Sequence, residues 1–344
     1  MSDDVLCRVE NGVGRITLNR PAALHALTTD MCRAMTAALL DWKADPSVRA
    51  VLFDHAGERG FCAGGDIRML AESGAADGVK AREFFFIEYR LNALLMSYPK
   101  PTIALMDGVV MGGGVGVALP CRTRVVTERT TFAMPETGIG LFPDVGGGWH
   151  LPRLPGRTGL WLALTGARIK GADCLALGLG TQFVASGEIA ALKAAILGGE
   201  RDAAARFASD PGPAPLAPHR AAIDTLFGGE SVEAIFAALA ADGSDWASAQ
   251  LATLQTKSPQ TLKVAFRQLA LGARAASFGD NMVTEYRIGA RVVARHDFLE
   301  GVRAVIIDKD NAPRWNPPTL EGVTDAMLDA IFAPLPAADE WTEL

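Results

Sequence analysis

Residues 107–116 read DGVVMGGGVG, a buried-strand pattern that runs directly into three consecutive glycines. Glycine inside regular structure costs about 0.5–1 kcal/mol relative to alanine, so a glycine triplet needs a physical reason. The spacing leaves three reasons open: close approach of the backbone to a ligand, close packing of the helix that follows, and a turn with positive φ. As a dinucleotide-binding fingerprint the glycines at 112, 114 and 116 are weak, because the third glycine is not in its proper place.

A second glycine turn lies upstream in RGFCAGGDI (59–67) and leads from a strand towards a short helix. Asp66 is predicted to be the N-cap of that helix rather than a catalytic acid. A glycine turn that opens a helix exposes free N–H groups at the positive end of the helix dipole. Two such N–H groups, one from each turn, could together form an oxyanion hole.

Strand and helix patterns alternate around these turns. Residues 14–21 and 48–57 have strand patterns, with a helical pattern at 28–43 between them, and residues 101–110 read as one buried strand. The other expected elements are short strands at 122–128 and 132–136 and helices at 81–98, 113–119, 157–165, 171–177 and 188–197. This alternation predicts an α/β core.

The texture of the chain changes near residue 201. The stretch 211–218 reads PGPAPLAP, and four prolines in eight residues exclude a helix or a central strand. Beyond it, apolar residues recur at helical spacing, as in 262–275 and 281–296. We therefore expect a core over residues 1–200, a proline-rich linker over 201–218, and a helical region over 219–344 that packs on the core.

Composition narrows the functional classes. The chain has 344 residues, of which 49% are hydrophobic, and a formal net charge of −6. That is enough apolar material for one or two domains, and no Lys/Arg-rich tract favours nucleic acid as a partner. The five cysteines contain no CxxC pair, which favours a reducing compartment. No secretory signal or membrane-spanning run is visible, so a cytoplasmic protein without a membrane partner is expected.

Acidic residues stand in apolar surroundings at two places. Glu136 and Asp144 lie eight positions apart in PETGIGLFPDVGGG (135–148), which is otherwise glycine, proline and apolar residues with one threonine. Glu88 lies in a helical pattern whose neighbours on the same face are Phe84, Phe85, Leu91 and Leu95. A buried charge costs several kcal/mol unless it is paired or hydrogen-bonded. Each acid is therefore exposed to solvent, paired with another group, or directed into a cavity where a substrate supplies the missing partner. For Glu88 the paired alternative is a contact with an arginine.

At these residues the sequence resembles the crotonase (enoyl-CoA hydratase/isomerase) superfamily. The matching motifs are LNRPAALHAL, GFCAGGDI, MGGGVGVAL and PETGIGLFPDVGG. The resemblance is strongest to the 3-hydroxyisobutyryl-CoA hydrolase branch, and there it extends through FFFIEYRLN (84–92), LTGARIKGADCLALGL (164–179), SPQTLKVAFRQL (258–269) and DFLEGVRAVIIDKDNAPRWNP (297–317).

The resemblance implies a core of repeated ββα units that binds a CoA thioester. The two backbone N–H groups of the oxyanion hole fall on Gly65 and Gly113, and Glu88 falls in the substrate site. No metal and no separate cofactor are implied, because CoA arrives as part of the substrate. A homo-oligomer is also implied, although the long C-terminal helices could cover the surface that assembles.

The choice of branch depends on where the acids stand. Hydratases of this superfamily use two glutamates, one of which falls on Gly116 here, whereas the other falls on Glu136. The position eight residues after Glu136, usually glycine in a hydratase, is Asp144. The resemblance therefore implies thioester hydrolysis, with Glu136 as general base or direct nucleophile and Asp144 bound to the substrate 3-hydroxyl. An enoyl-CoA hydratase/isomerase and a non-catalytic acyl-CoA-binding protein are the alternatives.

Other hydrolase chemistries lack their motifs. The chain has no GxSxG element, and its five histidines form no HxxxH pair, which argues against a serine esterase and a zinc hydrolase. His25 replaces the asparagine usual in the superfamily, and Cys62 and His150 are interpreted as packing residues. Glu285, Tyr286 and Arg287 are expected to tie the helical tail to the core.

Overall fold

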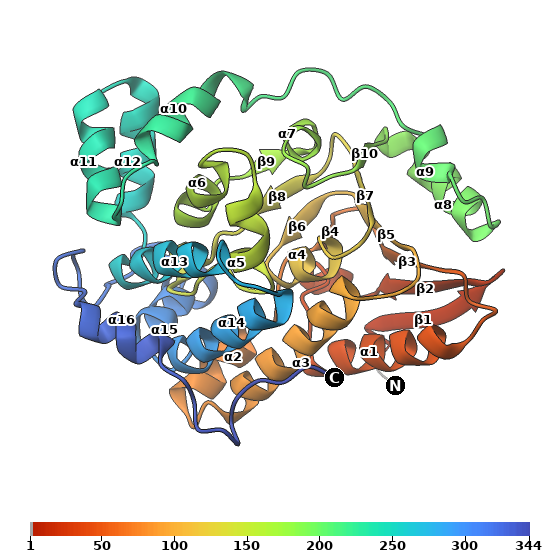
Figure 1. Cartoon of the computed structure of the whole chain (residues 1–344), viewed down its shortest axis with the longest axis horizontal. Coiled ribbons are helices and arrows are strands. Elements are labelled where there is room, and N and C mark those ends of the chain that lie inside the picture. The colour runs from red at the N-terminus through yellow and green to blue at the C-terminus, as the bar shows by residue number, and fades with distance from the viewer. Residues whose placement is uncertain (1–2) are drawn as a thin grey trace.

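Two β-sheets form the N-terminal part of the chain in the computed structural model, which describes residues 3–344 (Figure 1). The six-stranded sheet has the order β1 (Val5–Glu10), β2 (Val13–Leu18), β3 (Ala50–His55), β5 (Thr102–Met106), β7 (Thr123–Val126) and β10 (Gln182–Phe183). Only β1 and β2 pair antiparallel in this sheet. The four-stranded sheet has the order β4 (Gly60–Cys62), β6 (Val109–Met111), β8 (Thr131–Ala133) and β9 (Ile169–Lys170).

Successive segments of the core repeat one pattern: a strand in the first sheet, a strand in the second, then a helix. β3 and β4 precede α2 (Ile67–Ala75) and α3 (Val79–Met96), and β5 and β6 precede α4 (Gly113–Ala118). This is the expected ββα repeat, and the α/β prediction is confirmed. The expected helix at 28–43 is α1 (Thr29–Ala44), and Thr28 accepts a hydrogen bond from the Met31 N–H as its N-cap.

The prediction of a single strand at 101–110 is wrong, because the chain passes from one sheet to the other at Gly108. That residue has φ +90°, and a β-carbon on it would lie 2.6 Å from the Gly60 α-carbon. Gly60, which is distant in sequence, thus packs directly against the bend and leaves no room for a side chain at Gly108. β5 and β6 are the two halves of the expected strand.

Short helices complete the core after β8. They are η2 (Glu136–Ile139), α5 (Gly147–His150), η3 (Leu151–Arg153), α6 (Thr158–Thr165), α7 (Gly171–Ala176), η4 (Ser186–Glu188), α8 (Ile189–Leu197) and α9 (Ala203–Arg206), with η1 (Pro21–Ala23) lying earlier in the chain. The helices expected at 157–165, 171–177 and 188–197 are thus present with nearly the expected bounds.

The segment 201–218 carries α9 and then runs extended over the top of the molecule towards α10 (Figure 1). Two contacts hold the extended part to the core. The Ser209 N–H donates to the Phe183 carbonyl at 2.9 Å, and the Leu216 N–H donates to Asp173 Oδ1 at 2.8 Å. The proline-rich stretch therefore lies against the core as a fixed strap.

The C-terminal region is helical, as expected. Its elements are η5 (Ala217–His219), α10 (Arg220–Leu226), α11 (Val232–Asp242), α12 (Asp245–Gln255), α13 (Pro259–Gly272), α14 (Phe278–Val292), α15 (His296–Val302), a π-helical turn η6 (Arg303–Ile307) and α16 (Asp325–Phe332). α14 packs along α3, and α13 packs against α5. Buried side chains of these helices, such as Leu262, Ile288 and Phe298, belong to the same apolar core as α1 and β2.

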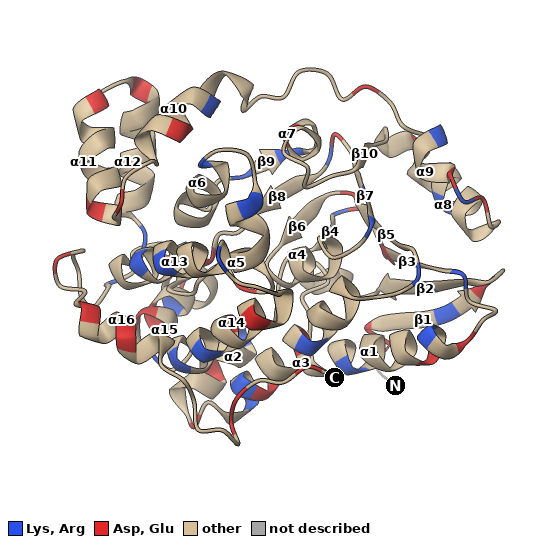
Figure 2. Cartoon of the chain, in the orientation of Figure 1, with Lys and Arg blue, Asp and Glu red and all other residues tan. Residues whose placement is uncertain are grey.

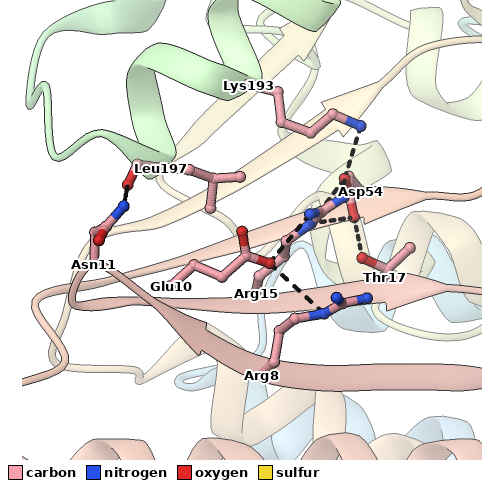
Figure 3. Close-up of polar contacts among 8 residues, drawn as sticks. All are labelled: Arg8, Glu10, Asn11, Arg15, Thr17, Asp54, Lys193 and Leu197. Carbon is pink, nitrogen blue, oxygen red and sulfur yellow. Dashed lines mark hydrogen bonds and ion pairs between the residues drawn. The ribbon is translucent and has the colours of Figure 1, made fainter.

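α8 covers the opposite face of the six-stranded sheet through a second, smaller apolar core. A buried acid, Asp54 of β3, lies beside it (Figure 3). Asp54 accepts from the Arg15 guanidinium at 2.8 Å, from Lys193 of α8 at 3.0 Å and from the Thr17 hydroxyl at 2.6 Å. Two cations and a hydroxyl thus compensate the buried carboxylate.

Lys and Arg residues are interspersed with Asp and Glu along the outer helices and loops, whereas α4 at the centre carries no charged residue (Figure 2). Within residues 3–344, no helix has the length and apolar character required to cross a membrane.

Candidate active site

One cavity brings the predicted site residues together. It is lined by Gly65, Glu88, Gly113, Glu136 and Asp144, which come from the β4–α2 turn, α3, the start of α4 and the η2–α5 segment. The remaining lining is mostly apolar and includes Ile67, Leu70, Phe84, Phe85, Met111, Ile139 and Leu141. The five positions expected from the sequence therefore face a common space.

The glycine turns approach each other so closely that side chains would not fit. Gly112 has φ +46°, and a β-carbon there would lie 3.1 Å from the Gly64 α-carbon. A β-carbon on Gly113 would lie 2.6 Å from Glu88 Oε1, and one on Gly114 would lie 2.5 Å from the Cys62 carbonyl oxygen. The three reasons left open for the triplet therefore act at different residues: Gly112 needs the unusual φ, Gly114 packs tightly, and Gly113 opens the cavity.

Two backbone donors are available at the cavity. Gly113 is the first residue of α4, so its N–H has no acceptor within the helix. Gly65 lies between β4 and α2, and the structure gives its N–H no acceptor among residues 3–344. Both residues line the cavity, so we expect their N–H groups to be available to a ligand oxygen. Their role as an oxyanion hole stays a prediction.

The acids at the cavity are buried, and their hydrogen bonds are incomplete. Glu136 and Asp144 are each 5% exposed, and Glu88 is 2% exposed. Glu136 Oε2 and Glu88 Oε1 have no hydrogen-bond partner among residues 3–344. The arginine pair considered for Glu88 is therefore not found in the described part of the chain. Asp144 Oδ2 accepts a hydrogen bond from the Tyr89 hydroxyl at 2.9 Å.

Burial raises the pKa of all three acids. The pKa of Glu136 lies well above its usual range because of burial and then the neighbouring Asp144 charge. Burial raises the pKa of Asp144 to about 7, against the opposing hydrogen bond from Tyr89. The pKa of Glu88 is also raised well above its usual range, by burial and by the charges of Asp144 and Glu285. Carboxyls with raised pKa values in a cavity are typical of acid–base sites.

Gly116 leaves no room for a carboxylate at the position where a hydratase has one. A β-carbon on Gly116 would lie 2.6 Å from the Val145 β-carbon and 2.7 Å from Asn92 Nδ2. Asn92 is fully buried, and neither polar atom of its amide has a hydrogen-bond partner among the described residues. These two side chains occupy the space that a second glutamate would need.

Tyr89 and Asn92 were not predicted as residues of the site. Both lie in the motif FFFIEYRLN, one residue and four residues after Glu88. Helical spacing places Asn92 one turn from Glu88 on the same face, and this was the signal available for it. The Tyr89–Asp144 contact joins residues 55 positions apart, and no local pattern predicts it.

The expected contacts between the tail and the core are present for Glu285 and Tyr286 but not for Arg287. Glu285 accepts hydrogen bonds from the Gly146 and Gly148 N–H groups, at 2.8 and 2.9 Å. The ring of Tyr286 lies 5.6 Å from that of Phe86 in α3, centroid to centroid. Arg287, by contrast, pairs with Glu340 at 2.9 Å, within the C-terminal region itself.

The smaller predictions near the site also hold. Asp66 accepts a hydrogen bond from the Met69 N–H as the N-cap of α2. His25 has φ +58°, in the left-handed region where asparagine and histidine are both enriched, and its Nδ1 accepts from the Arg20 N–H at 3.0 Å. Cys62 donates to the His25 carbonyl at 3.2 Å, and His150 packs on Phe278, so both are packing residues.

Metal ligands do not cluster in the described part of the chain. Within residues 3–344, no group of three or more His, Cys, Asp or Glu side chains is arranged to hold a metal ion. The cavity acids are candidates for proton transfer and for substrate hydrogen bonds.

Comparison with known proteins extends the match over nearly the whole chain. The family model described as enoyl-CoA hydratase/isomerase matches residues 13–332. The mitochondrial 3-hydroxyisobutyryl-CoA hydrolase of Danio rerio is 45% identical over 98% of this chain and 91% of its own length. The corresponding protein of Homo sapiens is 41% identical over 98% of this chain and 90% of its own length.

Two solved structures are also similar. One is described as a carnitinyl-CoA dehydratase from Mycobacterium thermoresistibile, with a TM-score of 0.95, 45% identity and coverage of 99% of both chains. The other is described as an enoyl-CoA hydratase from Rhodobacter sphaeroides 2.4.1, with a TM-score of 0.91, 41% identity and coverage of 99% of this chain and 100% of the other. The chain therefore belongs to the enoyl-CoA hydratase/isomerase family, and its resemblance to the 3-hydroxyisobutyryl-CoA hydrolases extends through both its core and its C-terminal helices.

Proposed function

We propose that the protein hydrolyses the thioester bond of 3-hydroxyisobutyryl-CoA and releases 3-hydroxyisobutyrate and CoA, a step of valine breakdown. One observation carries the proposal: Glu136 and Asp144, both buried, face one cavity with two free glycine N–H groups, while Gly116 excludes a hydratase-type second glutamate. The curated relatives named as this hydrolase support the choice of substrate.

The first element of the mechanism is carbonyl polarisation. The N–H groups of Gly65 and Gly113 donate hydrogen bonds to the thioester oxygen, which becomes an oxyanion as the nucleophile adds to the carbonyl carbon. One such donor typically contributes about 10²–10³ in rate. A β-carbon on Gly65 would lie 3.0 Å from the Phe84 ring and one on Gly113 would lie 2.6 Å from Glu88 Oε1, so both turns are closely packed.

Glu136 supplies or activates the nucleophile. As a general base it takes a proton from water, whose oxygen attacks the thioester carbon, and the C–S bond then breaks to release CoA thiolate. As a direct nucleophile it forms a mixed anhydride and releases the same thiolate, and water then opens the anhydride to regenerate Glu136. A thiol has a pKa of about 8.5, so the sulfur can leave as a thiolate without being protonated first.

Asp144 and Glu88 bind the acyl group in this proposal. Asp144 accepts a hydrogen bond from the substrate 3-hydroxyl, while Tyr89 holds its other oxygen. The Oε1 atom of Glu88, which has no partner among the described residues, lies beside the start of α4 and is available to the substrate. A site built to bind a hydroxyl discriminates against analogues that lack it, because the buried acceptor is then left unpaired.

Hydration of an enoyl-CoA is the second candidate, because the two similar solved structures are described as a dehydratase and a hydratase. That chemistry needs a carboxylate where this chain has Gly116, and Val145 and Asn92 fill the space. The purified protein should release free thiol from 3-hydroxyisobutyryl-CoA and leave the double bond of crotonyl-CoA intact. Hydration of crotonyl-CoA without thiol release would reverse the assignment. Binding of both thioesters without turnover would indicate a non-catalytic acyl-CoA-binding protein.

The remaining expectations are part of the same proposal. Turnover needs no metal and no cofactor beyond the CoA of the substrate, so activity should survive exhaustive chelation. A cytoplasmic location stays a prediction, because the hydrolase relatives are named as mitochondrial proteins. A homo-oligomer and the absence of nucleic-acid and membrane partners stay predictions as well.

A further inference from the structure

The loop that carries Asp144 has an unfavourable backbone. Val145 has φ +51°, in the left-handed region that a β-branched residue rarely adopts, and Gly146 follows with φ +91°. Such a conformation persists only where surrounding groups hold it. The loop 143–148 therefore needs an external support.

Glu285 of α14 supplies this support. It lies 139 residues after Gly146 and 137 residues after Gly148 in the sequence. It is fully buried, its Oε2 accepts the Gly146 N–H at 2.8 Å, and its Oε1 accepts the Gly148 N–H at 2.9 Å. A β-carbon on Gly148 would lie 3.1 Å from Glu285 Oε1 and 2.6 Å from Asn281 Oδ1. Glycine at 148 thus lets the carboxylate approach the loop.

Two amides of the C-terminal region hold the Glu285 carboxylate in turn. Asn281 Nδ2 donates to Glu285 Oε1 at 2.9 Å, and Gln268 Nε2 donates to the same oxygen at 3.2 Å. Gln268 Nε2 also donates to the Pro143 carbonyl at 2.6 Å. Pro143, directly before Asp144, and Gly146, two residues after it, are thus both hydrogen-bonded to this cluster.

We propose that Glu285 is a positioning residue of the hydrolase: it fixes the loop 143–148 so that Asp144 faces the cavity, and Tyr89 then sets the rotamer of Asp144. This inference rests on the proposed function. Glu285 does not line the cavity, so it acts through Asp144 rather than on the substrate. The C-terminal helices are in this way part of the catalytic apparatus.

Glu285→Gln is the test, because it keeps the shape and replaces one acceptor oxygen with an NH₂ group that faces N–H donors. Displacement of a catalytic group by about 1 Å costs about 10²-fold in rate. We expect kcat/KM for 3-hydroxyisobutyryl-CoA to fall by about this factor and the preference over isobutyryl-CoA to fall with it. In an Asp144→Asn background, Glu285→Gln should cost less than about threefold, because coupled residues are non-additive.

Glu340→Gln is the matched control. Glu340 accepts hydrogen bonds from Arg287, which lies on helix α14 as Glu285 does. No hydrogen bond joins Glu340 to the loop 143–148 in the described part of the chain, so both kcat/KM and the substrate preference should stay at wild-type values. If Glu285→Gln does not fold, Gln268→Met takes its place. It removes the hydrogen bonds to Pro143 and Glu285 at similar volume, and it should show the same coupling to Asp144 at smaller size.

The outcomes separate the inference from the proposed function. A wild-type protein that releases no thiol from 3-hydroxyisobutyryl-CoA overturns the proposed function and the inference with it. A wild-type protein that is active, with losses from Glu285→Gln that multiply with those of Asp144→Asn and leave the substrate preference unchanged, overturns the inference alone.

Discussion

Asp54 and Glu136 are both buried acids, at 2% and 5% exposure, yet their surroundings are opposite. Asp54 contacts Arg15, Lys193 and Thr17, which satisfy both of its oxygens (Figure 3). Glu136 has an oxygen without a partner among residues 3–344 and a second acid, Asp144, on the same cavity. A buried carboxylate is stable only when compensated, so the uncompensated one marks the place where substrate or water must bind.

The first prediction is that Glu136→Gln removes activity without weakening the fold. Loss of the base should lower kcat for 3-hydroxyisobutyryl-CoA by about 10²–10⁴, and loss of a covalent nucleophile should lower it further. The free energy of unfolding should stay equal or rise, because a buried carboxyl with an unpaired oxygen is replaced by a neutral amide. Thiol release and denaturant unfolding measure the two quantities on one preparation. A variant with wild-type kcat would exclude Glu136 from the chemistry.

The pH dependence of the free energy of unfolding should reveal the raised pKa of Asp144. Asp144 has a pKa raised by burial to about 7, from an ordinary value of 3.8, so folding favours its protonated form. The stability from this group is fully present below about pH 4 and is lost as pH rises through about 7. The whole shift corresponds to at most about 4 kcal/mol. Unfolding of wild type and Asp144→Asn at pH 4.5 and 7.5 should show a larger decline in wild type, and equal declines would contradict the raised pKa.

Asp144→Gly should lower the selectivity for the hydroxylated substrate. It removes the acceptor proposed for the 3-hydroxyl, and the ratio of kcat/KM for 3-hydroxyisobutyryl-CoA to that for isobutyryl-CoA should fall by about 10²-fold. Asp144→Asn still accepts a hydrogen bond, so its ratio should fall less. An unchanged ratio in Asp144→Gly would mean that Asp144 does not bind the hydroxyl.

Asp54→Asn should show the reverse pattern to Glu136→Gln. The change leaves Arg15 and Lys193 without their shared counter-charge, but both are partly exposed, so the loss of stability should be about 2 kcal/mol. Asp54 does not line the cavity with Glu136, so kcat should stay within about twofold of wild type. A large fall in kcat with unchanged stability would contradict a purely structural role of Asp54.

The local parts of the site could be predicted from the sequence. The glycine turns and the Asp66 cap follow from short motifs, because turn and cap chemistry is set by neighbouring residues. The local pattern of residues 135–148 left the surroundings of Glu136 and Asp144 open, and only the resemblance to the crotonase superfamily placed these two acids in the site. The contacts of Asp54 with Lys193 and of Glu285 with Gly146 join residues 139 positions apart, and only the packing of helices on the core brings them together. The bend at Gly108 was missed although Asp107-Gly108 is a local turn signal, and the close approach of Gly108 to Gly60 of another strand appears only in the fold.

We expect the buried acid without full compensation, Glu136, to act in catalysis, and the compensated acid, Asp54, to stabilise the fold. A side-by-side measurement of Glu136→Gln and Asp54→Asn tests it most directly, with thiol release from 3-hydroxyisobutyryl-CoA and the free energy of unfolding recorded for each. We expect Glu136→Gln to lose at least about 10²-fold in kcat with no loss of stability, and Asp54→Asn to lose stability with near wild-type kcat. Equal losses of kcat in the two variants would contradict it.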